Sequence, residues 1–340
     1  FWLLGLVMLG MPLAHPSALA QAPKGKQAKS VEVIRLVTLG PRSTPWWRVF
    51  QSWKTSLRQD SDGALKLDVR PGTAAGDEKA VVRKLKASRI DAATLSVTGL
   101  AMLVPEAAVL QAPGLVDDYA RYDKVRAALR AELEAAFAQR GYVVLGWGHL
   151  GRARLMSTKA IPHPAALAQA KSLTWPGDPV FHHVLAQAGA KKVARIPLSK
   201  VRQALEQGRI EVAPASALAA LYLGWQPHLK YVSKQSNAVL VSATVMRKAR
   251  FDALRAAAGS KATQALTSTG AKAHRLMRKL VAKRDEAAYR ELRKAGLKSM
   301  DLGAQRRAWQ KLADATSQRI AKQAGLFDKA WLKKAKDAAQ

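Results

Sequence analysis

The side chains that most often do chemistry are sparse in this sequence of 340 residues, which has no cysteine and seven histidines. Without cysteine there is no thiolate nucleophile, no disulfide and no thiolate metal site. His182 and His183 are adjacent, so on a helix they point in different directions and make a poor metal pair. Residues 146–151 match G-x-G-x-x-G, but the residues that follow predict a strand instead of a phosphate-binding helix. No other nucleophile, zinc or phosphate-loop motif is present, so the sequence predicts no enzyme, no metal and no cofactor.

The chain is strongly basic, with 56 Lys and Arg against 24 Asp and Glu and a formal net charge of +32. The basic residues are spread along the chain and are often mixed with acidic ones, as in residues 279–286. This distribution favours a cationic solvated surface over a nucleic-acid-binding arm. Binding of polyanions, or of an accessory protein, is the alternative function that the charge leaves open.

The first fourteen residues form an apolar, uncharged run, and the small residues Ala18 and Ala20 follow it, so residues 1–20 are the expected signal segment. This is the A-x-A pattern of a secretory signal peptide, here truncated, with Gln21 as the expected mature start. A polar linker follows over residues 21–30, and no cysteine follows the cut, which argues against a lipoprotein. The expected location is the periplasm; an N-terminal membrane anchor is the alternative reading.

Five segments alternate between strand and helix patterns at the start of the expected mature chain. Residues 31–38, 65–70 and 90–96 alternate apolar and polar side chains or are rich in β-branched ones, which indicates strands. A helical spacing of apolar residues begins at Trp46, and Asp77 is placed to cap a second helix. The order β-α-β-α-β predicts a mainly parallel sheet covered by helices.

The alternation continues to residue 242 and then ends. A helix over about 121–140 precedes strands at 142–147 and 154–157, and further strand and helix pairs lead to a strand at 238–242. We expect two α/β lobes of roughly 100 residues each. Beyond Met246 the chain reads as helical, with breaks expected at five glycines, Gly259, Gly270, Gly296, Gly303 and Gly325. A membrane-surface helix is the competing interpretation of this part.

The order of these residues resembles the extracytoplasmic solute receptors of TRAP (tripartite ATP-independent periplasmic) transporters. The resemblance covers about residues 31–255. It is carried by Gly76–Asp77–Glu78, Lys84–Ala92, Leu110–Pro113, Gly141–Gly148, Leu198–Ala213 and Val239–Ser242.

The resemblance implies a periplasmic-binding-protein-like fold of type II, with two α/β lobes, a ligand cleft between them and C-terminal helices. It further implies a small-molecule solute, hinge closure and delivery to membrane permease subunits, with no nucleic acid as partner. The expected division is lobe I over residues 31–148 with 236–255 and lobe II over 149–235 with 256–303. Residues 304–340 are expected to form a C-terminal helical extension.

One departure from the family concerns the solute carboxylate, which many members hold with an arginine in the second lobe. The corresponding stretch, residues 171–178, contains no arginine. Ala153 and Ala215 likewise stand where a second arginine and an asparagine are frequent. The sequence therefore resembles a branch of the family that lacks the usual carboxylate-binding arginine.

Position in this fold marks ten candidate ligand-binding residues. The aromatic ones could line the pocket or pack in the core. Arg152 and Arg154 could replace the missing arginine or be surface charges. Glu78 and Thr98 could make polar contacts, and Asp178 could bind solute or cap a helix. The set is Trp46, Glu78, Thr98, Trp147, Arg152, Arg154, Trp175, Asp178, Tyr222 and Trp225. The predicted solute is an organic acid or a more apolar small molecule.

Overall fold

The computed structural model describes residues 31–340 apart from 73, 75 and 324. The signal peptide predicted over residues 1–20 and the linker over 21–30 lie outside the described residues. Within the described part, none of the helices combines the length and the apolar character that crossing a membrane requires.

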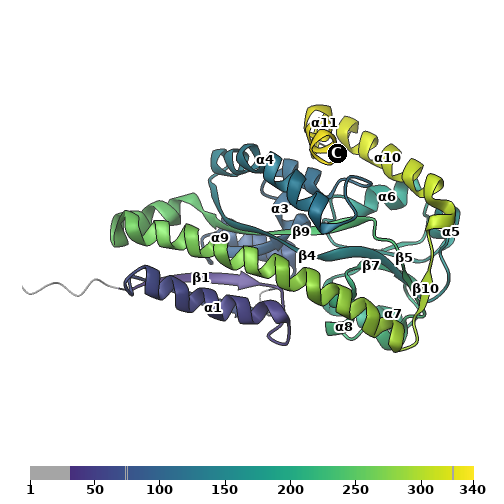
Figure 1. Ribbon diagram of the computed structural model, residues 1–340, viewed down its shortest axis with the longest axis horizontal. Coiled ribbons are helices and arrows are strands. Elements are labelled where there is room, and N and C mark those ends of the chain that lie inside the picture. Colours follow the sequence, from purple (N-terminus) through teal and green to yellow (C-terminus); the bar gives the residue numbers. More distant parts are fainter. Residues whose placement is uncertain (1–30, 73, 75, 324) are drawn as a thin grey trace, which may run out of the picture. The chain divides into compact units, whose positions relative to one another are not determined.

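The centre of the fold is a sheet with the strand order β2-β1-β3-β9-β4-β7-β5-β6, in which β8 also pairs with β4 and β10 with β8 (Figure 1). In its first half β1 (Glu32–Thr38) runs parallel to β2 (Leu65–Pro71) and β3 (Ala92–Ser96). The predicted strands at 31–38, 65–70 and 90–96 match these three. The mixed α/β class predicted from the sequence is therefore confirmed.

Two long strands join the halves of the sheet. β9 (Ala238–Arg247) runs antiparallel to both β3 and β4, and β4 (Tyr142–Ser157) continues into the second half by pairing with β7 (Val212–Ala215). The sequence predicted two separate strands where the structure has β4 alone. The pairing of β4 with β9 is irregular between Val144 and Gly146 and between His149 and Arg152. Such irregularities let a strand bend without ending, so β4 passes from one half of the sheet to the other as one strand.

The second half of the sheet is made of short strands. These are β5 (Ser172–Thr174), β6 (Val193–Arg195), β7, β8 (Tyr231–Ser233) and β10 (Lys298–Met300). β5 is parallel to both β6 and β7, and β10 is parallel to β8.

Helices of the first half follow their strands as the apolar spacing predicts. α1 (Pro45–Asp60) buries Val49, Phe50, Trp53 and Leu57 on one face. α2 (Glu78–Lys86) begins where predicted, because the side chain of Asp77 accepts a hydrogen bond from the backbone N–H of Ala80 at 2.8 Å. The others are α3 (Val97–Ala101), the 3₁₀ helix η2 (Pro105–Gln111) and α4 (Tyr119–Gln139).

Helices of the second half are short. They are α5 (Pro164–Gln169), α6 (Phe181–Gln187), α7 (Val201–Glu206) and α8 (Ala217–Tyr222), with 3₁₀ turns η3 (Leu198–Lys200), η4 (Gln226–His228) and η5 (Gly303–Gln305).

The helical stretch α9 (Lys248–Lys294) runs along both halves of the sheet and packs on α1, β4 and α8 (Figure 1). Gly259, with φ 87°, breaks it into two helical segments, as predicted. The break predicted at Gly270 is wrong. A Cβ there would lie 2.5 Å from the carbonyl oxygen of Leu145, so this glycine serves the close approach of α9 to β4.

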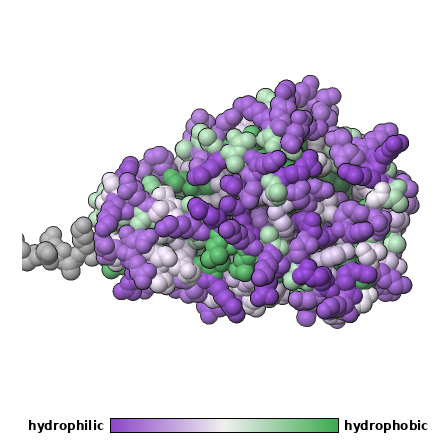
Figure 2. All heavy atoms as spheres, viewed as in Figure 1, coloured by the Kyte–Doolittle hydropathy of each residue, from purple (hydrophilic) through white to green (hydrophobic). Residues whose placement is uncertain are grey.

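The last two helices, α10 (Arg306–Gln323) and α11 (Lys329–Ala338), lie against different halves. α10 packs on α6 of the second half, while α11 packs on α4 of the first (Figure 1). Ile320, Phe327 and Leu332 join the core of the first half. The C-terminal segment expected as an extension is thus built into the packing. Hydrophilic side chains cover most of the face shown in Figure 2, with smaller apolar patches between them.

Candidate functional site

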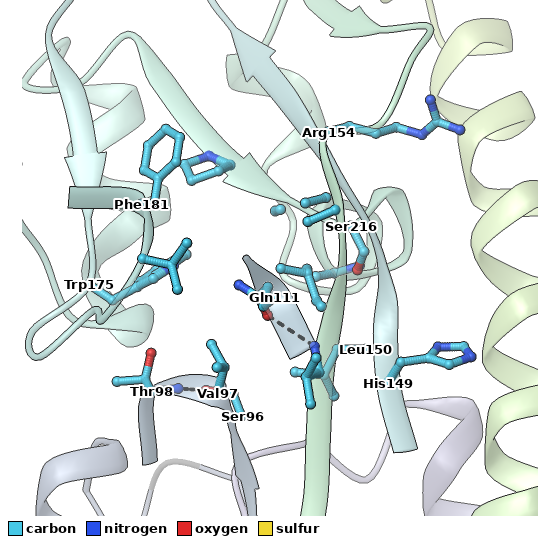
Figure 3. Close-up of a pocket in the computed structure, with 18 of the residues that line it drawn as sticks. Ser96, Val97, Thr98, Gln111, His149, Leu150, Arg154, Trp175, Phe181 and Ser216 are labelled. Atoms are coloured by element: carbon cyan, nitrogen blue, oxygen red, sulfur yellow. Dashed lines mark hydrogen bonds between the residues drawn. The ribbon is translucent and has the colours of Figure 1, made fainter. Parts of the chain in front are cut away.

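A cavity of about 790 Å³ lies between the two halves of the sheet (Figure 3). Its walls come from the carboxyl end of β3 and the starts of α1 and α2 on one side, and from the end of β5 and the starts of α6 and α8 on the other. β4, β9 and α10 complete the lining. The carboxyl ends of strands are where open α/β sheets bind their ligands.

Four side chains from the second half form what we call the aromatic wall: Trp175, Phe181, Tyr222 and Trp225. The rings of Trp175 and Trp225 stack with centroids 6.3 Å apart and an interplanar angle of 27°. Trp225 is 1% exposed, so it supports the wall from within the core, whereas Tyr222 is 37% exposed and lies at the accessible edge of the wall. In Figure 3, Trp175 and Phe181 face the cavity across from Gln111 and Leu150. The aromatic wall can bury the apolar body of a ligand.

The opposite side, which we call the polar wall, consists of Thr94, Ser96, Thr98 and Gln111. Gln111 accepts a hydrogen bond on Oε1 from the backbone N–H of Val241 at 3.0 Å. Because that contact identifies the oxygen, the amide nitrogen is the end left to donate, and Figure 3 shows it turned into the cavity. Gln111 is therefore an oriented neutral donor.

A chain of hydrogen bonds fixes what Thr94 can offer. His274 Nδ1 lies 2.8 Å from the carbonyl oxygen of Gly270, which can only accept, so Nδ1 carries the proton and Nε2 is the acceptor. Thr244 therefore donates to Nε2 at 2.9 Å and accepts from the hydroxyl of Thr94 at 2.7 Å. Burial lowers the pKa of His274 to about 4, so the ring is neutral near pH 7. Thr94 consequently presents lone pairs to the cavity.

Glu78 connects the start of α2 to the polar wall. Its Oε1 accepts a hydrogen bond from the backbone N–H of Ser96 at 3.0 Å, while Oε2 is buried with no hydrogen-bond partner among the described residues. Burial raises the pKa of this carboxyl to about 7. Glu78 thus holds the end of β3 in place, and its charge depends on pH in the neutral range.

Two arginines of β4 are already engaged. Arg152 pairs with Glu286, and its backbone N–H donates to Asp285 at 3.0 Å. Arg154 is 1% exposed; it donates to the carbonyl oxygens of Ser233, at 3.0 Å, and Lys234, and its guanidinium lies 4.1 Å from the ring centre of Tyr289. Figure 3 shows this side chain running away from the other labelled residues.

Asp285 on α9 ties together elements around the cavity. Its carboxylate accepts hydrogen bonds from the backbone N–H groups of Arg152 and Leu218, each at 3.0 Å, and from the hydroxyl of Tyr119 at 2.9 Å. Burial raises the pKa of Asp285, and these three donors oppose the shift. Tyr119 in turn stacks on His149, with ring centroids 4.5 Å apart.

His149 lines the cavity from β4 and is 2% exposed. Burial lowers its pKa to about 4, so it is a neutral group near pH 7. Among the described residues, no three histidine, aspartate or glutamate side chains gather as a metal site.

The family model for bacterial extracellular solute-binding proteins of family 7 matches residues 36–324. The chain belongs to this family. The TRAP receptor resemblance predicted from the sequence is thereby confirmed, as is the prediction of a receptor instead of an enzyme.

Solved receptors share this fold at low identity. One is a Sulfitobacter TRAP periplasmic solute-binding protein with bound β-D-galacturonate, at 17% identity and a TM-score of 0.81 over 90% of this chain and 100% of that one. Another is the Bordetella pertussis receptor DctP7, which binds pyroglutamic acid, at 17% identity and a TM-score of 0.80 over 91% of this chain and 99% of that one. A third is a Citrobacter koseri TRAP receptor with bound D-glucuronate, at 19% identity and a TM-score of 0.79 over 90% of this chain and 99% of that one. The periplasmic-binding-protein-like fold is thus confirmed.

Eight of the ten residues predicted for the receptor's site line the cavity, namely Trp46, Glu78, Thr98, Arg154, Trp175, Asp178, Tyr222 and Trp225. Trp147 and Arg152 do not. Trp147 is 3% exposed, packs on Phe137 and donates from Nε1 to Glu134 at 3.1 Å.

Asp178 lies two residues before Val180, the N-cap of α6, and binds the backbone where the chain enters that helix. Its Oδ1 accepts from the backbone N–H groups of Val180 and Phe181 at 2.8 and 2.9 Å, and its Oδ2 accepts from the Thr174 hydroxyl at 3.0 Å. The carboxylate therefore fixes the chain where it enters α6, which carries Phe181 of the aromatic wall.

Sequence reasoning missed Gln111, His149, Phe181 and Thr94 as lining residues of the receptor. Gln111 is a polar residue at the end of an apolar segment, and His149 is a polar residue in an apolar strand. Both patterns are signals of a buried polar contact that the sequence does offer. Phe181 and Thr94 sit within ordinary helix and strand patterns and carry no such signal.

Proposed function

We propose that this receptor captures an organic acid or a more apolar small solute in the cavity between its two halves. The observation that carries the proposal is the contrast between the aromatic wall on one side of a 790 Å³ cavity and the oriented hydrogen-bonding groups of the polar wall on the other. Such a mixture is typical of sites that bury most of a small ligand and orient it with few polar contacts.

The organic acids bound by the related receptors support an acid as the solute class. The aromatic wall supports a solute with more apolar surface than a sugar acid, because Trp175 and Phe181 bring large apolar rings to the cavity. We assign direct solute contact to Trp46, Thr98, Trp175 and Tyr222, with Gln111 as an added donor. Glu78, Arg154, Asp178 and Trp225 act by holding those side chains in place.

The proposed lobes are those of the sequence, with residues 31–148 and 236–255 in one and 149–235 and 256–303 in the other. β4 passes through the boundary after residue 148, and α9 packs on elements of both proposed lobes. Closure on the solute would therefore bend β4, β9 and α9 together. The receptor would act in the periplasm and deliver its solute to the TRAP membrane permease subunits.

The test is a thermal-shift screen of the protein from Gln21 onward against carboxylates, aromatic acids and neutral apolar metabolites. A solute at one hundred times its Kd stabilises the folded state by about 2.7 kcal/mol, so a specific ligand raises the melting temperature. Trp175→Ala should abolish the shift, while Trp331→Ala, on α11 and outside the cavity lining, should retain it.

Two outcomes contradict the proposal. One is that no small molecule shifts the melting temperature while heparin does so in a salt-dependent way, which would favour the polyanion-binding alternative. The other is that a specific solute raises the melting temperature of Trp175→Ala as much as that of the unchanged protein, which would place the solute outside this cavity.

A further inference from the structure

Three cationic side chains line the cavity, all of them arginines: Arg121, Arg154 and Arg306. Arg154 is committed to two carbonyl oxygens and to the ring of Tyr289. Arg121 donates from Nε to the carbonyl oxygen of Ala339 at 3.1 Å and lies 3.7 Å from Asp117. Both guanidinium groups are therefore already engaged.

Arg306 differs from the other two. Within the described part of the chain, no hydrogen bond or ion pair engages its guanidinium, although the residue lines the cavity. It is the first residue of α10, in the C-terminal segment that the sequence suggested only as an extension.

The position of Arg306 is set by contacts on both of its sides. Before it, Gln235 accepts from the backbone N–H of Leu302 at 2.8 Å and donates to Asp301 at 2.6 Å, which pins the turn that leads into α10. After it, Trp309 donates from Nε1 to the carbonyl oxygen of Pro162 at 3.0 Å. The start of α10 is thereby anchored to the second half of the fold.

The rest of α10 crosses to the first half. Ser317 donates its hydroxyl proton to the carbonyl oxygen of Pro113 at 2.7 Å, and a Cβ on Gly114 would lie 3.0 Å from Ala313. Ile320 is buried in the core cluster of the first half. α10 therefore lies across the cavity between α6 and the residues after η2, with Arg306 on the lining.

We propose that Arg306 is the anion-binding group of this receptor and that it holds the carboxylate of the solute from α10. The inference rests on the proposed function, because it needs an acid as the solute. A planar guanidinium without a protein partner can form two parallel hydrogen bonds with a carboxylate. The role that many family members give to an arginine of the second lobe is then taken by the C-terminal helix.

The other charged groups of the lining favour one orientation of such a solute. Asp77, Glu78, Asp117 and Asp178 are acidic, and His149 is neutral near pH 7. A carboxylate near these groups would be repelled or would gain nothing, whereas near Arg306 it gains a charge-assisted pair. The acid group therefore points toward α10, and the body of the solute points toward the aromatic wall.

The experiment compares four acids with their own primary amides: L-pyroglutamate, pantoate, D-glucuronate and 3-phenylpropionate. Tryptophan fluorescence or calorimetric titration gives each Kd for the unchanged protein and for Arg306→Gln, Arg306→Lys and Arg307→Gln. Arg307 is the matched control, because it is the next residue of the same helix, is exposed and is outside the lining.

For an acid that binds, the unchanged protein should prefer it over its amide by about 10-fold or more, the range of one charge-assisted hydrogen bond. Arg306→Gln should remove that preference, Arg306→Lys should keep part of it, and Arg307→Gln should keep all of it. Melting curves without solute should be alike for all variants, because Arg306 has an exposed side chain.

The two levels of inference fail differently. If Arg306→Gln keeps the preference for the acid, or Arg307→Gln loses it equally, the assignment of Arg306 is wrong while the receptor for acids stands. If the unchanged protein binds none of the acids, or binds acid and amide equally, a carboxylate is not what the cavity selects; the assignment of Arg306 then falls, while the proposal of a more apolar small solute stands.

Discussion

The two walls of the cavity are built by different kinds of interaction. In the polar wall, single directed hydrogen bonds fix each group: Val241 orients Gln111, and Thr244 together with His274 orients Thr94. In the aromatic wall, the side chains are held by ring stacking and burial, as in the Trp175 and Trp225 pair. A hydrogen-bonded wall discriminates by the position of donors and acceptors, whereas a stacked wall discriminates by shape and apolar area. A solute that spans the cavity as proposed would therefore be selected at its two ends by different kinds of contact.

The largest effect is expected where the aromatic wall is most buried. Trp225→Ala should lower the free energy of unfolding by about 3–5 kcal/mol, because the indole is 1% exposed and its loss leaves a cavity. Tyr222→Ala, in the same wall but 37% exposed, should cost less than about 1 kcal/mol. Urea unfolding of both variants measures the difference. Equal losses would mean that burial does not decide the strength of this wall.

A smaller loss is expected from breaking the polar wall at its buried link. Thr244→Val should lower the free energy of unfolding by about 1–3 kcal/mol, because it leaves Nε2 of His274 buried without a donor. Thr94→Val removes a hydroxyl from the cavity end of the same chain and leaves the bond from Thr244 to His274 intact, so it should cost less than about 1 kcal/mol. Chemical denaturation compares the two. A larger loss for Thr94→Val would reverse the donor order derived above.

The polar wall should also respond to pH through Glu78. Its folded pKa of about 7 lies above the ordinary value of 4.5, so the folded state keeps a proton that the unfolded state has lost between these values. This contribution is fully present below about pH 4.5 and is lost as the pH rises through 7. Glutamine has no proton to lose.

The free energy of unfolding of Glu78→Gln, relative to that of the unchanged protein, should therefore increase by more than about 1 kcal/mol between pH 5 and pH 8. Glu291→Gln, an exposed residue of α9, serves as the control and should show no such trend. Denaturation curves at pH 5, 6, 7 and 8 provide the measurement. A trend of opposite sign would mean that Glu78 is stabilised in its charged form.

A small change in stability is expected at Trp175, the half-buried ring of the stacked pair in the aromatic wall. Trp175→Leu should lower the free energy of unfolding by about 1 kcal/mol, mainly through the lost stacking on Trp225. Its near-ultraviolet circular dichroism should lose the signal of the stacked pair. A loss as large as that of Trp225→Ala would show that the two rings form one structural unit.

Local patterns sufficed to predict the first half of the fold. The strands at 31–38 and 65–70 and the cap at Asp77 depend on periodicity and on a side chain three residues from its donor, which are visible within a short window. Trp175 directly follows β5, and Thr98 lies in α3 directly after β3. Both line the cavity, because residues that follow a strand lie at the edge of the sheet where the cavity is.

Side-chain direction in β4 could not be predicted in this way. Alternation along a strand assigns faces only while the pairing is regular, and β4 has irregularities on both sides of Trp147. Each shift of one residue changes which face a side chain takes, so Trp147 enters the core and Arg152 pairs with Glu286. Nothing in the local sequence of β4 marks these shifts.

Arg306 could not be recognised from the sequence for a different reason. It is one of 56 basic residues, and what distinguishes it is that it lines the cavity without a partner among the described residues, which is a property of the folded neighbourhood. The roles of Asp285 and His274 are hidden similarly, because their partners lie far away along the chain, at Arg152, Leu218 and Thr244.

The packing of α10 and α11 also sets an order in time. Ile320, Phe327, Leu332 and Ala339 share a core cluster with Val37 and Leu95, which lie far earlier in the chain. During synthesis, β1 and β3 therefore keep apolar surface uncovered until α10 and α11 have been made, and a partly made chain exposes that surface in the meantime. The core of the first half closes only when both segments are present.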